Sequence, residues 1–271
     1  MDLTMPKKNF RPLLHSSVLS CFVLCWGTGA GILYAQNHSQ NQKLRAGESN
    51  IISPKQEKSE APKMANTIKL PEPVYKSSIS VEEAILKRRS VRDFSNKKLP
   101  IELISQLLWS AQGITDKTNK FRAAPSAGAL YPMELYIVSP DGIFHYIPDG
   151  HRIQKLQGDD LRQDLANACW GQNFVAVAGI SIIIAADYGR TTWRYGNKGI
   201  RYVDIEAGHI AQNIHLQSVA LNLGSVPVGA FNDKAVKSLL KLPAAQQPIY
   251  VIPVGYPVRE TLLPETPENE K

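Results

Sequence analysis

Three arginines and a serine stand together in the stretch Arg88-Arg89-Ser90-Val91-Arg92, at the end of a predicted helix. Two guanidinium groups four residues apart, with a small hydroxyl between them, can donate paired hydrogen bonds to a phosphate. A further arginine, which is always charged, can stabilise the electron-rich edge of a redox ring. The same residues are also common at a solvated helix C-terminus, where they complement the helix dipole. Taken alone, the cluster favours that structural interpretation over an anion site.

Two segments of small residues, 124–132 and 224–232, suit the close approach of a ligand. The first reads Ala-Pro-Ser-Ala-Gly-Ala-Leu-Tyr-Pro and the second Gly-Ser-Val-Pro-Val-Gly-Ala-Phe-Asn. Small side chains let the backbone come near a bound molecule, and prolines hold a turn rigid. Both segments could instead be structural connections, one a tight loop before a strand and the other a link from a helix to a strand.

Possible metal ligands are few. Glu206 and His209 have the Glu-x-x-His spacing of carboxylate-bridged metal proteins, but such a centre needs a second copy of the motif, and the sequence contains none. The three cysteines, Cys21, Cys25 and Cys169, build neither a metal cluster nor a disulfide framework. We therefore predict no metal, and we expect Cys169 to be a small buried apolar residue.

Several function classes lack support. The chain contains no Gly-x-Ser-x-Gly elbow, no His-Glu-x-x-His helix and no P-loop, which argues against hydrolases and NTPases. Its net charge of +7 invites a nucleic-acid interpretation, but the charges are scattered and form no basic helix. We predict no nucleic-acid partner.

The elements that position these residues follow from caps and hydrophobic periodicity. Gly208 lies in the middle of the longest predicted helix, where it costs about 1 kcal/mol relative to alanine and so predicts close packing against another group. Helices come first and strands cluster without regular alternation, which is an α+β pattern. The predicted helices span 80–89, 100–113, 160–170, 199–223 and 233–240, and the predicted strands span 133–138, 143–147, 181–186 and 249–254.

The two ends of the chain differ in composition from its centre. Residues 1–35 combine early positive charges with an uncharged apolar run at 13–35, which predicts a signal peptide or, alternatively, an uncleaved membrane anchor. Residues 36–74 are polar and predict a disordered linker, and 261–271 predict a flexible tail. One folded domain is left at 75–260. Because basic residues precede the apolar run, we expect this domain to be exported, periplasmic or membrane-anchored.

Four ordered motifs resemble the nitroreductase family, and in particular its SagB-type dehydrogenase branch. They are Arg-Arg-Ser-x-Arg-x-Phe from Arg88, Pro-Ser-Ala-Gly-Ala-Leu-Tyr-Pro from Pro125, Glu-Ala-Gly-His-x-x-Gln-Asn from Glu206, and Pro-Val-Gly-Tyr-Pro from Pro253. Each motif is weak alone, but their order and spacing are specific. The resemblance covers residues 75–260 and implies an α+β fold that binds FMN, with a central, mostly antiparallel sheet flanked by helices.

The resemblance also implies how FMN is bound. The flavin would lie at the interface of an intertwined homodimer. Its phosphate, ribityl chain and ring edge would contact the first motif and a later arginine, that is Arg88, Arg89, Ser90, Arg92 and Arg259.

The flavin ring would contact both subunits. The backbone at Gly229 and Ala230 would approach N5, where hydride would enter and leave in a ping-pong oxidoreductase reaction on a small-molecule or peptide substrate. The ring would be covered by Pro125, Ser126, Ala127 and Gly128 of the partner subunit.

Two features depart from the SagB-type pattern. Branch members that oxidise azoline rings carry a Lys-Tyr pair before the Glu-Ala-Gly-His helix, and the comparable residues here are Arg194 and Tyr195. Arginine is a poor proton-transfer base, which argues against thiazole or oxazole formation and leaves Tyr195 as the candidate acid or base. An exported domain would also need an electron partner other than NAD(P)H, such as a quinone. The main alternative function is flavin binding without redox turnover.

Overall fold

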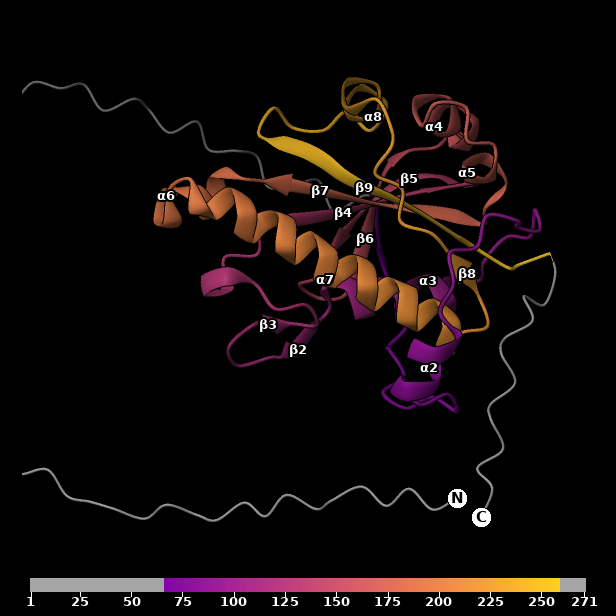
Figure 1. The fold of residues 1–271 in the computed structure, drawn as a ribbon, viewed down its shortest axis with the longest axis horizontal. Coiled ribbons are helices and arrows are strands. Elements are labelled where there is room, and N and C mark those ends of the chain that lie inside the picture. The colour runs from indigo at the N-terminus through magenta and orange to yellow at the C-terminus, as the bar shows by residue number, and fades with distance from the viewer. Residues whose placement is uncertain (1–65, 259–271) are drawn as a thin grey trace, which may run out of the picture. The chain divides into compact units, whose positions relative to one another are not determined.

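The computed structural model describes residues 66–258 of the chain. Its main feature is a seven-stranded sheet with the strand order β1-β6-β5-β4-β7-β9-β8 (Figure 1). All neighbouring strands run antiparallel, which confirms the predicted α+β fold with an antiparallel central sheet. These strands are β1 (Thr67–Lys69), β4 (Met133–Ser139), β5 (Gly142–Ile147), β6 (Arg152–Gln157), β7 (Ile180–Asp187), β8 (Gly224–Ser225) and β9 (Gln246–Gly255).

Helices cover both faces of this sheet (Figure 1). A separate two-stranded sheet pairs β2 (Ile114–Asp116) with β3 (Phe121–Arg122). Between residues 66 and 258, no helix is long and apolar enough to cross a membrane. The helices are α2 (Val81–Lys87), α3 (Ile101–Gln112), the 3-10 helix η2 (Ala127–Ala129), α4 (Arg162–Ala168), α5 (Phe174–Val177), α6 (Gly189–Tyr195), α7 (Lys198–Ala220) and α8 (Asp233–Leu239).

Strand β7 is an inner strand of the sheet, between β4 and β9, as its largely apolar sequence predicts. Side chains alternate between the two faces of a strand, so β7 contributes to two separate cores. Ile182 and Ile184 pack in the core under α3 and α7, whereas Ile183 and Ala185 pack in the core under α4 and α8. The sheet is therefore buried on both sides and gives the site a rigid base.

Helix α7 is 23 residues long, which corresponds to about 35 Å. One side of it is apolar and packs on α3 and the sheet, through Val203, Ala207, Ile210 and Ile214. These positions recur every three or four residues, as the predicted helix at 199–223 requires. The helix spans the whole site described below, and its two ends carry different parts of that site.

The folded region begins earlier than the sequence suggests. Strand β1 pairs with β6 within the range 36–74 that was expected to be a linker, and Leu70 is buried beside it. The predicted start of the folded domain at residue 75 is therefore too far along the chain. The reason is that a three-residue edge strand is too short to show a recognisable hydrophobic pattern. Strand β6 and helix α6 were missed for a similar reason, since β6 is largely polar and α6 buries only Thr191.

Candidate functional site

The arginine cluster does not lie on a helix. Helix α2 ends at Lys87, and Arg88 already has an extended backbone, with φ −56° and ψ 122°. Ser90 then forms a parallel β-bridge with Ser225 in β8. The helix predicted to reach Arg89 is thus two residues too long. In an extended chain, residues two apart share a side, so Arg88, Ser90 and Arg92 can face one ligand together.

Arg89 is separated from that set. Its Nη1 donates hydrogen bonds to the carbonyl oxygens of Leu86, at 2.9 Å, and Arg88, at 2.7 Å. Carbonyls in the last turn of a helix have no partner within the helix, and a basic side chain can satisfy them. The structural interpretation of a basic helix end therefore applies to Arg89, while the anion-binding interpretation needs only Arg88, Ser90 and Arg92.

His215 of α7 lies next to the β-bridge that holds the arginine segment, and the sequence patterns did not point to it. It is buried, and its Nδ1 lies 2.9 Å from Ser225 Oγ, beside the bridge to Ser90. Burial and the nearby charge of Arg88 lower the pKa of His215 to about 4, so its ring is neutral at neutral pH. A polar residue inside the apolar stripe of α7 was the only signal for it in the sequence.

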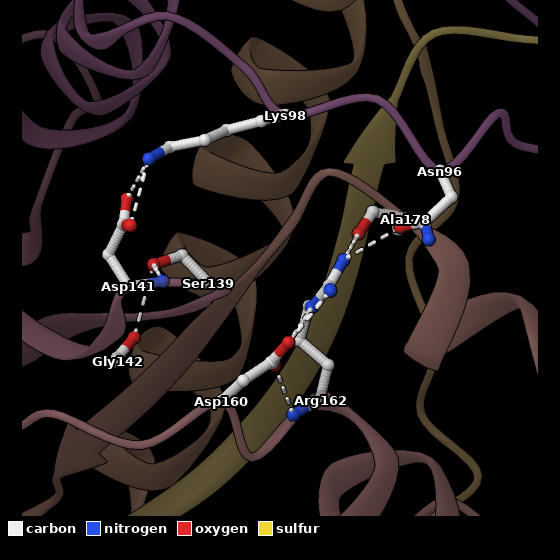
Figure 2. A network of polar contacts seen from close by, with 8 residues as sticks. All are labelled: Asn96, Lys98, Ser139, Asp141, Gly142, Asp160, Arg162 and Ala178. Carbon is white, nitrogen blue, oxygen red and sulfur yellow. Dashed lines mark hydrogen bonds and ion pairs between the residues drawn. The ribbon is translucent and has the colours of Figure 1, made fainter.

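The chain that follows the arginines is anchored by ion pairs and hydrogen bonds (Figure 2). Lys98 Nζ lies 2.7 Å from a carboxylate oxygen of Asp141, in the turn between β4 and β5. Arg162 pairs with Asp160 at 2.8 Å and also donates to the carbonyl of Ala178, at 3.0 Å. Figure 2 shows the Arg162 guanidinium between Asp160 and Ala178, close to Asn96. Asn96 and Lys98, which follow the arginine segment, therefore contact the start of α4 and the turn between β4 and β5.

The first small-residue segment contains η2, and its residues 125–131 are called the η2 segment below. Gly128 in it has φ +63°, and a Cβ at this position would lie 2.7 Å from Tyr195 Oη and 3.0 Å from Arg194 Nη1. Arg190 of α6 also donates to the carbonyl of Tyr131, at 3.3 Å. The structure thus brings together two predicted parts of the site that are over sixty residues apart, the η2 segment and the pair Arg194–Tyr195.

A buried carboxylate lies behind the η2 segment. Glu206 is 2% exposed, and burial raises its pKa to about 7, although hydrogen bonding from Ser126 and Gln112 and the charge of Arg122 favour its ionised form. The sequence motif suggested Glu206 only as a metal ligand. Among residues 66–258, no group of three or more potential metal ligands is close enough to hold an ion. Glu206 is therefore a buried carboxylate whose pKa lies near neutral pH.

The remaining predicted residues lie away from the η2 segment or outside the described part of the chain. Gly229 and Ala230 are exposed in the connection after β8, where Gln172 Nε2 donates to the Ala230 carbonyl at 2.9 Å. Cys169 is fully buried, and burial raises the pKa of its thiol to about 11, as expected of an apolar structural cysteine. Arg259, Cys21 and Cys25 lie outside the described residues, as do the predicted signal peptide and tail.

The two groups of site residues lie at opposite ends of α7 (Figure 1). Tyr195 packs edge-on against Tyr202 near the start of the helix, with ring centroids 5.3 Å apart. Arg88 lies near His215, thirteen residues further along. At the rise of an α-helix this spacing is about 20 Å. The two predicted groups of site residues are therefore well separated within one chain, and they are called the arginine half-site and the η2 half-site below.

Comparison with known sequences identifies the class of protein. The profile of the nitroreductase family matches residues 85–256, and the chain belongs to this family. A protein of Methanocaldococcus jannaschii named as a nitroreductase is 42% identical over 183 residues, which are 65% of this chain and 91% of that protein. The chain is thus a nitroreductase-family oxidoreductase.

Solved structures agree with this assignment. A structure described as a nitroreductase from Ralstonia eutropha superimposes with a TM-score of 0.66 at 27% identity, covering 72% of this chain and 90% of that chain.

The trifolitoxin-processing protein TfxB of Rhizobium leguminosarum is 26% identical over 163 residues, which are 54% of this chain and 44% of that protein. The similarity to TfxB is distant and does not establish the SagB-type branch.

Proposed function

We propose that the protein is an FMN-dependent oxidoreductase that works as a homodimer, with one flavin at each of two sites between the subunits. The observation that carries this proposal is the separation of the two half-sites along α7. Neither half-site is complete alone, and a two-fold arrangement would bring the arginine end of one subunit to the η2 segment of its partner.

The residues of the arginine half-site fit the chemistry of FMN. Arg88 and Arg92 would bind the phosphate with charge-assisted hydrogen bonds, and Ser90 would donate to the ribityl or phosphate oxygens. Gly229 and Ala230 are exposed in the connection that follows β8, the strand that pairs with Ser90. When bound, FMN would supply hydride transfer at N5, which suits a ping-pong reaction with two substrates in turn.

The exposed side of α7 supports the proposed dimer. Gly208 has nothing within 4 Å of a Cβ built on it, so the close packing that a mid-helix glycine predicts is not found among residues 66–258. Nearby apolar side chains are also exposed, among them Ile205 at 48%. On α2, Val81 and Ile85 are 66% and 57% exposed. Apolar surface of this kind is commonly covered by a partner, and a second copy of this chain would cover it.

Arg194 and Tyr195 would act on the substrate rather than on the flavin phosphate. The Tyr195 hydroxyl lies against the η2 segment, and the Arg194 guanidinium is 5.5 Å from the centre of the Tyr195 ring. We propose that Tyr195 donates or accepts a proton and that Arg194 supplies a fixed positive charge, because arginine does not release its proton at neutral pH. A small molecule or a peptide would be the substrate.

The electron partner depends on where the domain resides. We propose that residues 1–35 export or anchor the chain, which would favour a quinone over NAD(P)H. Stopped-flow reduction of the bound flavin by NADH, NADPH and a quinol, each tested in turn, separates these donors. A flavin that none of them reduces would favour the alternative function, flavin binding without turnover.

The direct test of the cofactor site is the double variant Arg88→Ala, Arg92→Ala. Loss of two charged phosphate contacts should weaken FMN binding by about a hundredfold or more, since each such hydrogen bond contributes roughly 1.5–3 kcal/mol. FMN content after purification and a titration of the flavin-free protein measure this effect. Lys234→Ala, an exposed basic position on α8, is the control and should bind FMN like the unaltered protein. Equal FMN affinity in the double variant would show that the phosphate assignment is wrong.

A further inference from the structure

The η2 segment has an unusual backbone that needs support. Gly128, Ala129 and Tyr131 all have positive φ, at 63°, 54° and 47°. A residue with a Cβ rarely adopts this left-handed conformation, which costs on the order of 1 kcal/mol and persists only where surrounding contacts impose it. The segment therefore depends on the groups that hold it from outside.

Those contacts lead to Glu206. The Tyr131 N–H donates to Ser126 Oγ at 2.9 Å, and Ser126 is one of the groups that lower the pKa of Glu206. From α3, Gln112 Nε2 donates to Glu206 Oε1 at 3.4 Å. Arg122 Nη1 in turn donates to Gln112 Oε1 at 3.1 Å. The side chains of Arg122 and Gln112 thus donate in sequence toward the Glu206 carboxylate.

Arg122 closes the network at the other end of the segment. Its backbone N–H donates to Tyr131 Oη at 3.1 Å, and its guanidinium lies 4.5 Å from the centre of the Tyr131 ring. The carboxylate on α7, the amide on α3 and the arginine on β3 therefore form a chain of contacts that reaches Tyr131, at the C-terminal end of the η2 segment.

We propose that Glu206 is a positioning residue that holds the η2 segment in the conformation in which it covers the flavin of the partner subunit. This inference rests on the proposed function, because it assigns the segment to the cofactor. Burying a carboxylate is costly, and an apolar residue would fill the same space at lower cost. The carboxylate offsets this cost because it accepts a hydrogen bond from Gln112 of α3, which is linked through Arg122 to Tyr131 of the η2 segment. An apolar side chain cannot form this link.

The positioning of the η2 segment by Glu206 should depend on pH. The charged group that faces Glu206 is Arg122 from β3, whereas its neighbours from α3 and from the η2 segment, Gln112 and Ser126, are uncharged. Tyr131 lies beyond Arg122, and Arg190 of α6 contacts the Tyr131 carbonyl. The ionised carboxylate is the better acceptor for both donors. Flavin affinity should therefore rise with pH through about 7, where Glu206 loses its proton.

The first experiment uses the flavin-free full-length chain and measures backbone hydrogen exchange. In Glu206→Gln, the amides of residues 126–131 should exchange about tenfold faster, while those of β7 keep their rates. Glu102→Gln, at an exposed position of α3, is the matched control and should leave both unchanged. Unaltered exchange of the segment in Glu206→Gln would overturn the proposal. This variant keeps the shape of the protonated side chain, so it should fold, and circular dichroism verifies that it does.

The second experiment titrates the same proteins with FMN between pH 6 and 8, a range that brackets the pKa of about 7 for Glu206. The unaltered protein should bind FMN about tenfold more tightly than Glu206→Gln above pH 7, and their ratio should fall as the pH decreases. The ratio removes the phosphate ionisation of FMN, which both proteins share. Faster exchange with equal affinity at every pH would contradict a positioning role. An unaltered protein that binds no FMN would instead contradict the proposed function. The exchange rates would still show whether Glu206 positions the η2 segment.

Discussion

At the scale of single residues, Gly128 connects the η2 segment to Arg194 and Tyr195. Its φ of +63° favours glycine, and so does the distance of only 2.7 Å that would separate a Cβ at this position from Tyr195 Oη. The two requirements are distinct, because one concerns the backbone of the segment and the other concerns its contact with α6. Substitutions can separate them.

Gly128→Ala should destabilise the protein by roughly 1–2 kcal/mol, the cost of a left-handed backbone. The contact with Tyr195 should add little, because the atoms that a Cβ would meet are the ends of the Tyr195 and Arg194 side chains, which can move aside. Urea unfolding measures the loss. Gly171→Ala is the matched control, because Gly171 has φ +74° and nothing within 4 Å of its Cβ position. It should show the backbone cost alone. A clearly larger loss at Gly128 would mean that these side chains cannot move aside.

At the scale of elements, α7 connects both half-sites to the sheet through buried polar residues. Glu206 contacts the η2 segment and α3, and His215 contacts β8 and lies near Arg88. The apolar stripe between them packs on the sheet core. A long helix with polar side chains at two points can therefore position two sites that are remote from each other.

The pKa of His215 predicts a loss of stability in acid. Folding lowers this pKa from its ordinary value of 6.5 to about 4, so the unfolded chain binds a proton that the folded protein does not. The stabilisation is complete above pH 6.5 and is lost as the pH falls through about 4, by about 3 kcal/mol in all. The unfolding free energies of the unaltered protein and of His215→Gln should therefore approach each other, or change order, as the pH falls from 6.5 to about 4. Parallel pH profiles would argue against a buried neutral histidine.

At the scale of the whole molecule, the proposed dimer makes Gly208 part of a close contact between copies. Gly208→Gln should leave the folded subunit as stable as before, or up to about 1 kcal/mol more stable, because glycine is a poor helix former. The larger side chain should nevertheless shift the protein from dimer to monomer. Light scattering at several concentrations measures the mass. A dimer that persists with unaltered affinity would place the interface elsewhere.

Much of the fold was predictable from sequence because its large elements carry strong patterns. The apolar run of β7, the periodic stripe of α7 and the capping serine before α2 all gave elements close to those observed. Strand β1 and helix α6 were missed, because short or polar elements are stabilised by their neighbours rather than by their own pattern. Tertiary contacts can override or replace local propensity in this way.

The fold class and the family can be read from residue order, because the four ordered motifs and the hydrophobic periodicity are properties of that order. Which candidate residues lie close together is known from the three-dimensional structure. It separated Arg89 from Arg88, placed Tyr195 against Gly128 and showed Glu206 as a buried carboxylate behind the η2 segment. The physical reason is that hydrogen bonding, desolvation and charge depend on distances between residues far apart in the chain, which residue order does not contain.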